Sequence, residues 1–463
     1  CPRIRRAARG SARRARACPR GRGSSVGAVA RSLSGALAEI AGSEHVLEDG
    51  SARARFAVDG LEPRWVARPA SLDAVGRLLA LAHDANLAVV PRGGGTALEL
   101  GRLPARLDLV LDLSRLDRIV EYSPDDLTIT VEAGVTAGAL AAKLAAHRQF
   151  LPLDPPGAAA RTLGGIAATN ASGPLRARYG AMRDLLLGVR FVQADGVSTW
   201  GGAKVVKSVS GYDVPKLMVG ALGTLGVLGE LTLRLHPAPE FEAGWLAGFA
   251  EAAAAHAFVT HLLDSPVQPN RVEWLNAAAL AMCGFAGMGA AVAVSIATAE
   301  AAVRAQGETL RAFVREAGGM VTPLGDGFWV RYEKAMAPDG GVRLAIATLA
   351  SKVSETADEV AQAVGDECSG ARPTLTACVP VGSLRVWFLE ADPRRVSAVV
   401  ERLRQFVAPV GGSVVIQKAP AAVRAAVDPW GPIEAGPLAL MRGLKDEFDP
   451  KRVLNPGRFV GGL

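Results

Sequence analysis

Residues 89–96 read Val-Val-Pro-Arg-Gly-Gly-Gly-Thr. We predict a strand over Leu87–Val90 that runs directly into a glycine loop. Because glycine lacks a Cβ atom, such a loop can adopt positive φ and bring its backbone close to a ligand. Its successive amide groups can form an anion-binding nest suited to a pyrophosphate, to which Thr96 adds a hydroxyl and Arg92 a charge. Taken alone, the stretch is also compatible with a sharp turn between strand and loop.

Two further glycine-rich clusters lie downstream. Residues 161–173 read R-T-L-G-G-I-A-A-T-N-A-S-G. These small and hydroxyl-bearing side chains suit a groove for a long, flat ligand. A tightly packed loop would show the same residue types. Residues 220–229 read G-A-L-G-T-L-G-V-L-G, which is not the G-x-G-x-x-G dinucleotide fingerprint. Residues 201–208 (G-G-A-K-V-V-K-S) lack the glycine before the lysine of a P-loop, so we do not expect nucleoside triphosphate hydrolysis.

The composition is that of a globular protein. The 463 residues suggest about three domains or two large ones. Hydrophobic residues make up 49% and charged residues 21%, which excludes a mostly disordered chain. The net charge of +7 is concentrated at one end, because residues 1–31 contain ten arginines and no acid. Removing those ten charges from +7 leaves −3 for residues 32–463, so we infer no nucleic-acid-binding domain.

The basic stretch 1–31 has three interpretations. It could follow from a translation start placed upstream of the natural one. It could also be a disordered basic arm that binds RNA or a membrane, or a transit-like peptide. It begins with Cys1 and contains no apolar run like that of a secretory signal. None of the three interpretations affects the expected chemistry.

Sequence motifs for metals and hydrolysis are absent. The five cysteines form no C-x-x-C pair, so we expect no zinc ribbon and no iron–sulfur cluster in this chain, and their sparse spacing indicates a reducing compartment. The sequence contains no H-E-x-x-H and no G-x-S-x-G, and we predict no metal site. Residues 274–299 carry no charge but are rich in Ala and Gly. We predict a helix, a glycine turn and a strand at about 291–297 there, not a membrane span.

Local patterns predict regular elements around the glycine clusters. Ser71 has the character of an N-cap for a helix whose apolar residues follow at helical spacing. The tripeptide Ala194-Asp195-Gly196 has hairpin chemistry. The other predicted elements are strands over 107–113, 118–122, 127–131, 185–193 and 198–200, and a helix over about 136–147.

The three clusters together resemble the FAD-binding domain of the vanillyl-alcohol oxidase / p-cresol methylhydroxylase (PCMH-type) family. The resemblance rests on residues 89–96, on A-T-N-A-S-G-P at 168–174, and on V-V-K-S-V-S-G-Y-D at 205–213 leading to G-T-L-G-V at 223–227. Within the family, the closest similarity is to the FAD-binding E subunits of bacterial glycolate oxidases. In those subunits Asn and Ala commonly stand at the places of Ser208 and Ser210.

The resemblance implies an α+β fold with a PCMH-type FAD-binding domain of two α/β subdomains (32–238) and an α+β cap (239–430). A C-terminal segment (431–463) returns to the FAD domain. In some relatives a histidine in the first glycine loop attaches FAD covalently. Thr96 stands there in this sequence, so we predict non-covalent FAD.

Carried over residue by residue, the resemblance predicts which residues bind the cofactor and leaves the catalytic residues unknown. The predicted cofactor-binding residues are Arg92, Gly93, Gly94, Gly95, Thr96, Thr162, Gly164, Gly165, Thr169, Asn170, Ser172, Gly173, Tyr179, Gly226, Val227 and Asn455. Four residues of the predicted cap have two interpretations. They face the substrate or the flavin, or they lie at the surface or in the packing of cap strands. They are Arg271, Glu273, Trp329 and Arg331.

The resemblance implies an FAD-dependent subunit that oxidises glycolate or a similar 2-hydroxy acid to its keto acid, glyoxylate for glycolate. It would work with a second FAD subunit and an iron–sulfur subunit, in the cytoplasm or at the inner face of the cell membrane. The catalytic D subunit of such complexes carries a G-H-x-G-D-G-N-x-H stretch that has no match here. Two alternatives remain: a self-sufficient FAD-linked oxidase or dehydrogenase of another alcohol or 2-hydroxy acid, and a non-catalytic scaffold of this fold.

Overall fold

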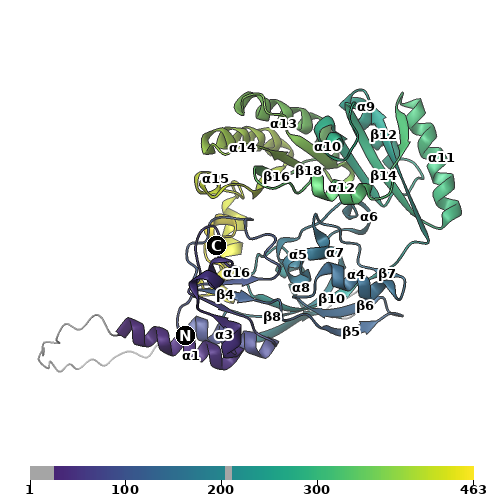
Figure 1. Cartoon of the computed structure of the whole chain (residues 1–463). Helices are drawn as coiled ribbons and strands as arrows, with labels where there is room; N and C mark the ends of the chain where they lie inside the picture. Colours follow the sequence, from purple (N-terminus) through teal and green to yellow (C-terminus); the bar gives the residue numbers. More distant parts are fainter. Residues whose placement is uncertain (1–24, 204–210) are drawn as a thin grey trace, which may run out of the picture.

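The computed structural model describes residues 25–203 and 211–463 (Figure 1). Most of the basic stretch 1–31 and much of the motif at 205–213 lie outside the described residues, as does most of the P-loop-like stretch at 201–208. In Figure 1 the N-terminal domain lies below a second α+β body, the cap. The yellow helix α16 (Ala435–Phe448) lies between the two bodies at one side.

The first subdomain is a small sheet in the order β1-β2-β4-β3, in which β2, β4 and β3 are parallel. The predicted helix after Ser71 is confirmed: the Ser71 hydroxyl accepts the N–H of Ala74 at 3.2 Å, and the apolar stripe of α3 is buried. Helix α1 begins at Ser25, inside the predicted tail, and its second half packs on the same core through Leu37. The elements are α1 (Ser25–Ala41), β1 (Val46–Leu47), α2 (Gly50–Ala54), β2 (Trp65–Ala67), α3 (Leu72–Asp84), β3 (Val89–Arg92) and β4 (Leu109–Asp112).

The second subdomain is an antiparallel sheet in the order β5-β6-β10-β8-β9. The predicted hairpin is confirmed, because β8 and β9 pair on either side of residues 194–196. Short helices and a two-stranded ribbon, β7 with β11, complete it. The elements are β5 (Ile119–Ser123), β6 (Thr128–Glu132), α4 (Ala137–Ala145), β7 (Gln149–Phe150), α5 (Leu163–Thr169), α6 (Arg176–Tyr179), α7 (Met182–Leu185), β8 (Leu186–Val192), β9 (Ser198–Gly202), α8 (Val214–Met218), β10 (Val227–Arg234) and β11 (His236–Pro237).

Within residues 211–463, the cap is built on an eight-stranded antiparallel sheet in the order β15-β12-β14-β13-β17-β18-β16-β19. Residues 274–299 contain α10 and β14, which confirms the predicted helix, turn and strand. Among the described helices, none combines the length and the apolar character needed to cross a bilayer. The elements are β12 (Phe241–Phe249), α9 (Ala252–Leu263), β13 (Arg271–Asn276), α10 (Ala277–Met282), β14 (Ala290–Thr298), α11 (Glu300–Glu316), β15 (Met320–Pro323), α12 (Phe328–Ala335), β16 (Val342–Ala347), α13 (Val353–Glu367), β17 (Thr374–Cys378), β18 (Ser383–Phe388), α14 (Pro393–Val407), β19 (Ser413–Lys418) and α15 (Ala421–Ala426).

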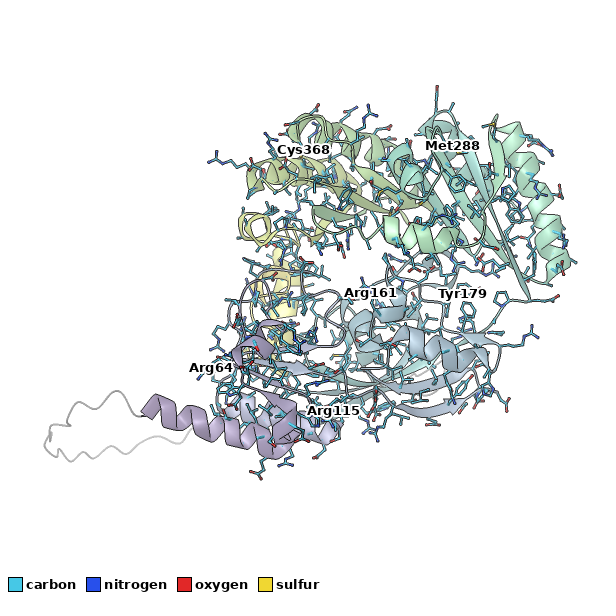
Figure 2. The ribbon with its side chains drawn as sticks, viewed as in Figure 1. Arg64, Arg115, Arg161, Tyr179, Met288 and Cys368 are labelled. Carbon is cyan, nitrogen blue, oxygen red and sulfur yellow. The ribbon has the colours of Figure 1, made fainter. Side chains whose placement is uncertain are left out.

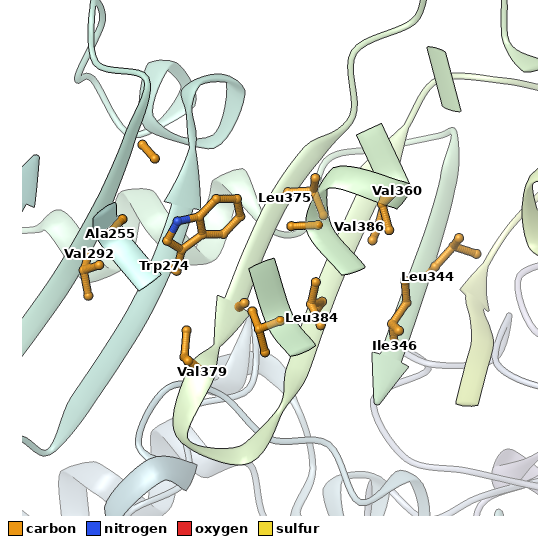
Figure 3. Close-up of a cluster of buried hydrophobic side chains, with 14 of the residues drawn as sticks. Ala255, Trp274, Val292, Leu344, Ile346, Val360, Leu375, Val379, Leu384 and Val386 are labelled. Carbon is orange, nitrogen blue, oxygen red and sulfur yellow. The ribbon is translucent and has the colours of Figure 1, made fainter. Parts of the chain in front are cut away.

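The two faces of the cap sheet differ beneath α13 and α14. Alternate residues of β16 and β18 point to the helices and are buried, among them Leu344, Ile346, Leu384 and Val386 (Figure 3). Because side chains alternate along a strand, the residues between them point to the opposite face, toward the N-terminal domain. In Figure 1 α13 and α14 lie on the outer side of the cap. The inner face of β16, β18 and β19 therefore forms a roof over the N-terminal domain.

Candidate cofactor site

The first glycine cluster continues β3 as a loop that lies against the second cluster. Gly95 has a φ of +71°, a conformation that favours glycine. A Cβ atom on Gly93 would lie 2.1 Å from Oγ1 of Thr162, and one on Gly94 would lie 3.0 Å from the Ala160 oxygen. Since side chains would separate the two segments, glycine permits their close contact.

The second cluster forms the short helix α5 and its ends. The Thr162 hydroxyl caps the helix by accepting the N–H of Gly165 at 3.2 Å. A Cβ on Gly164 would lie 2.7 Å from that of Ala133, so glycine lets α5 lie directly on the strand end. The helix ends at Asn170, which has a φ of +48°. Thr169 and the residues after it therefore face the roof formed by the cap.

The third cluster is held by the C-terminal segment. The Asn455 side chain donates to the Leu222 oxygen at 2.6 Å, and its backbone N–H donates to the Val89 oxygen at 2.8 Å. Leu454 pairs with Val89 in parallel beside β3. The buried ammonium of Lys445 donates to the oxygens of Thr224 and Leu454 and to Asp449, at 2.7–3.0 Å. The C-terminal segment thus links the first and third clusters.

Three cavities of about 60, 80 and 200 Å³ follow one another along these clusters. Arg92 and Thr162 line the first two, and Thr96 and Thr169 line the last two. We call the three together the cofactor cleft. It runs from the third cluster, past the first glycine loop, to the space beneath the roof of the cap.

Most of the predicted cofactor-binding residues line this cleft. The predicted residues that line it are Arg92, Gly93, Gly94, Gly95, Thr96, Thr162, Gly164, Gly165, Thr169, Asn170, Ser172, Gly226, Val227 and Asn455.

Gly173 and Tyr179 line none of the three cavities. A Cβ on Gly173 would lie 1.8 Å from the Asp154 oxygen, so this glycine allows a close contact between two loops. The Tyr179 ring packs edge-on against Phe150 and His236, with centroids 5.6 and 5.1 Å away. In Figure 2 Tyr179 lies to one side of Arg161.

The polar groups of the cleft fit a flavin dinucleotide with its pyrophosphate. Within the described part of the chain, the backbone N–H groups of residues 93–96 donate to no other residue. The buried donor Nε of Arg92 also lacks a partner there, and so does one acceptor, Oδ1 of Asn455. An anion beside the glycine loop would satisfy several of these donors at once, as in a backbone nest. A long cleft with such a polar section and apolar walls is the shape this cofactor requires.

Arg458 adds a buried positive charge to the same section of the cleft. Its guanidinium donates to the oxygens of Leu98 and Leu100, which positions the loop after the glycines. Burial lowers the pKa of Arg458 to about 10; the charge of Arg424 acts in the same direction, and that of Asp59 opposes them only in part. A phosphate would compensate that buried charge.

The section beneath the roof is rich in cations. The described cationic residues that line it are Arg161, Arg176, Arg343, Arg385 and Lys418, and the one carboxylate is Glu99. Lys418 of the cap pairs with Glu99 of the N-terminal domain at 2.6 Å. In Figure 2 Arg161 lies on the side of the N-terminal domain that faces the cap. The section is therefore suited to an anionic ligand.

Arg385 connects the cap to the second cluster. Its guanidinium donates to the Ser172 oxygen at 3.0 Å and to the Tyr332 hydroxyl at 3.2 Å, and lies 3.7 Å from Glu273. Burial raises the pKa of Glu273, whose carboxyl accepts a hydrogen bond from Tyr332 at 2.5 Å. Burial disfavours charge on Arg385, but Tyr332 and Glu273 outweigh it and raise the pKa of this arginine. The side chain is held in place and stays charged.

Of the four candidate residues of the cap, Trp329 and Arg331 serve its packing, Glu273 lies beside Arg385, and Arg271 joins the cap to the N-terminal domain. Arg271 pairs with Asp154 and lies over the Trp329 ring, while the Trp329 indole donates to Ser295. Arg331 donates to a backbone oxygen. None of the four lines the cofactor cleft as the described residues form it.

Sequence reasoning missed the residues that the cap contributes. Arg343 and Arg385 are single charges in the alternating strands V-R-L-A-I-A and S-L-R-V-W-F, a pattern that any half-exposed strand could show. The sequence does indicate a role for Arg458 near the cofactor. This residue follows Asn455-Pro456-Gly457 in a segment that is expected to return to the FAD domain.

Two protein families match the chain. The FAD binding domain family matches residues 63–201, and the C-terminal domain family of FAD linked oxidases matches residues 383–459. The first region contains the first two glycine clusters. The second contains Arg385, Lys418 and most of the C-terminal segment.

Relatives and solved structures agree with these domains. The chain is 31% identical over 245 residues to the glycolate oxidase subunit GlcD of Bacillus subtilis, spanning 52% of this chain and only about half (52%) of that protein. It is 27% identical over 430 residues to the probable mitochondrial D-lactate dehydrogenase of Danio rerio, which covers 86% of this chain and 84% of the relative. A p-cresol methylhydroxylase structure superposes with a TM-score of 0.73 at 15% identity, covering 92% of this chain and 96% of that one.

The predicted α+β fold with a PCMH-type FAD-binding domain and a cap is confirmed, and so is FAD as the cofactor. The assignment to an E-type subunit stays a prediction, because the matched glycolate oxidase relative is named as subunit GlcD. The chain carries the FAD-binding domain and the C-terminal domain of FAD-linked oxidases.

Proposed function

We propose that this chain holds FAD non-covalently and takes part in the oxidation of a 2-hydroxy acid of the glycolate or lactate type. The observation that carries the proposal is the cationic section of the cofactor cleft beneath the cap. A 2-hydroxy acid presents a carboxylate next to the carbon that is oxidised, so its binding site needs a fixed cation beside the flavin. The named activities of the two relatives, glycolate oxidase subunit and D-lactate dehydrogenase, support this choice of substrate class.

The proposal gives the residues of the cleft separate roles. The glycine loop with Arg92 and Arg458 binds the phosphates of the cofactor, and the free Oδ1 acceptor of Asn455 is available to a donor group of the same cofactor. Arg385, held by Ser172 and Tyr332, orients the substrate carboxylate through a charge-assisted hydrogen bond. The cap excludes water from the reacting carbon. When bound, FAD supplies the acceptor for the hydride that leaves this carbon.

Non-covalent binding is supported by the side chains of the cleft. The described residues that line it include no histidine, cysteine or tyrosine, the side chains that could be joined to a flavin. Thr96 lies in the cleft at the position where some relatives carry a histidine.

A partner-dependent subunit is the form of the enzyme we propose. The relative from Bacillus subtilis is named as a subunit, and the absence of a C-x-x-C motif favours passage of electrons to another chain. The proposed complex contains a second FAD subunit and an iron–sulfur subunit, in the cytoplasm or at the inner face of the cell membrane. The three described cysteines are unpaired, which agrees with a reducing compartment.

The first test uses the purified chain and its visible spectrum. Acid precipitation should release about one FAD per chain, and a covalent flavin would stay in the pellet. Glycolate, lactate and other 2-hydroxy acids are then added without oxygen. Bleaching of the flavin by any of them in the isolated chain would establish a self-sufficient enzyme.

Bound FAD without bleaching, with turnover restored by the partner subunits, would support the subunit form. A folded chain that binds no flavin would contradict the proposal. So would a reconstituted complex that turns over equally well without this chain.

A further inference from the structure

We propose that the substrate carries a second anionic group and that Arg161 and Arg343 bind it together, from opposite sides of the cofactor cleft. This inference rests on the proposed function and narrows its substrate class. Glycolate and lactate carry one anionic group. The inference therefore points to 2-hydroxy acids with a carboxylate or a comparable anion at the far end.

The roof of the cleft presents its cations in a row across three strands. In the register of the cap sheet, Ala345 of β16 faces Arg385 of β18, and Arg343 lies two residues further along β16. Arg343 and Arg385 thus point to the same face at diagonal positions, whose backbones are about 7–8 Å apart. Arg343 also faces Lys418 of β19 across the strand pair. The row is long enough to offer two separate anion-binding positions.

Two of these cations are already balanced by the protein. Arg385 lies 3.7 Å from the buried carboxyl of Glu273, and Lys418 pairs with Glu99 at 2.6 Å. Arg385 is fixed by neutral acceptors as well. It can hold one carboxylate in a defined orientation, but the protein alone leaves little excess charge at this position.

Arg161 and Arg343 are not balanced. Among the described residues, no carboxylate lies within ion-pair distance of either guanidinium. Arg161 donates to the Pro156 oxygen at 2.9 Å and Arg343 to the Pro338 oxygen at 3.1 Å, both neutral acceptors. The Nε of Arg343 is buried and has no partner within residues 25–203 and 211–463. Glu99 and Asp339 act on Arg343 only at longer range.

The two arginines also repel each other across the cleft. Burial, and after it the charge of Arg343, lowers the pKa of Arg161, while burial lowers that of Arg343. Like charges in a shielded site destabilise the closed arrangement of cap and N-terminal domain unless an anion lies between them. Two guanidinium groups on opposite walls can each donate to one carboxylate, and such charge-assisted bonds are the strong ones.

The test measures binding without turnover, so it does not depend on the reaction. The FAD-loaded chain is titrated with glutarate and with butyrate, which differ by one carboxylate and lack the hydroxyl to be oxidised. Binding is followed by calorimetry and by the change in the flavin spectrum. We expect glutarate to bind at least about ten-fold more tightly than butyrate, the effect of about 1.4 kcal/mol.

The variants Arg161→Gln and Arg343→Gln should each remove most of that preference and leave butyrate binding within about two-fold. Arg343→Lys should keep part of it, because the charge remains while the planar donor pair is lost. Arg395→Gln, on the exposed side of α14, is the matched control and should change neither affinity. FAD content is measured for every variant, so that a loss of cofactor is not taken for a loss of the anion.

Three outcomes would overturn the inference: equal affinity for glutarate and butyrate, a preference that persists in both Gln variants, or loss of FAD from both variants. Inorganic phosphate distinguishes a free oxyanion from a substrate group. If the affinity for phosphate depends on both arginines and the affinity for glutarate does not, the inference of a substrate with two anionic groups is wrong. Bleaching by lactate with no glutarate preference would leave the proposed function standing and remove only this inference.

Discussion

The two walls of the cofactor cleft are built in different ways. The wall of the N-terminal domain is mostly backbone: its glycine loops touch each other with few side chains between them, and Arg161 and Arg176 add cations only beneath the roof. The wall of the cap is side chain: long cations that reach down from three neighbouring strands. A wall made of backbone requires residues without Cβ at consecutive positions, whereas a wall made of side chains draws one residue from each strand. The first leaves a local pattern in the sequence and the second does not.

Breaking the contact that holds the two walls together should cause the largest loss of stability. Arg424 of α15 is buried and pairs with the equally buried Asp59 of the N-terminal domain, and it also donates to the Gly101 oxygen at 3.3 Å. Removing one partner leaves a buried charge without compensation, which costs about 3–5 kcal/mol. We expect Arg424→Met to lower the free energy of unfolding by that amount in urea denaturation.

The control for the buried ion pair between Arg424 and Asp59 is an exposed ion pair. Arg395→Met breaks the ion pair with Glu390 and should cost less than about 1 kcal/mol. Asp59→Asn combined with Arg424→Met should recover part of the loss, since no unpaired charge remains. Equal stability of wild type and Arg424→Met would refute a structural role for the pair.

The backbone wall is tested at Gly93. A Cβ there would lie 2.1 Å from the Thr162 hydroxyl, so alanine must push the first two clusters apart. We expect Gly93→Ala to weaken FAD binding at least about ten-fold, a change of about 1.4 kcal/mol, measured as flavin retained after gel filtration. Gly365→Ala is the matched control: its added Cβ meets nothing within 4 Å, and alanine should stabilise α13 by about 0.5–1 kcal/mol. Full flavin content in Gly93→Ala would show that the contact is not needed.

The side-chain wall is tested at Arg385. Loss of a hydrogen bond to a charged group costs about 1.5–3 kcal/mol, so Arg385→Gln should raise the KM for the 2-hydroxy acid about 10- to 100-fold. FAD content should stay unchanged, because the residue lies on the cap wall. If Arg385→Gln instead loses its flavin and keeps its KM, the division of roles between the walls is wrong.

A smaller effect concerns pH and the interior of the cap. Burial raises the pKa of the Cys283 thiol from its ordinary value of 9.0 to about 11. The unfolded chain therefore loses the thiol proton at a lower pH than the folded chain. The stability that the protonated thiol contributes is fully present below pH 9, and it is lost as the pH rises toward 11. In urea unfolding between pH 8 and 11, Cys283→Ala should show a shallower fall in stability than wild type. Parallel pH profiles would contradict the prediction.

The sequence predicts the backbone wall and much of its surroundings. Glycine loops and hydroxyl caps such as Ser71 and Thr162 are local features, and the structure has them where the residues indicate. The cap wall depends on which face of a long sheet lies over another domain. Nothing in the six residues around Arg343 or Arg385 specifies that, because the relevant neighbours are more than 150 residues away, as in the bond from Arg385 to Ser172. Trp329 and Arg331, two candidates in the cap, lie instead within the packing of that domain.

The strand pairing of Leu454 with Val89 has a consequence for synthesis of the protein. The cleft is completed by residues that the ribosome adds more than 350 positions after the first glycine loop. A nascent chain can form both sheets of the N-terminal domain, yet Asn455 and Arg458 are still missing from the wall. Capture of the flavin is therefore expected only after residues 455–458 have emerged from the ribosome, and chains that stop early in the cap should be colourless apoprotein.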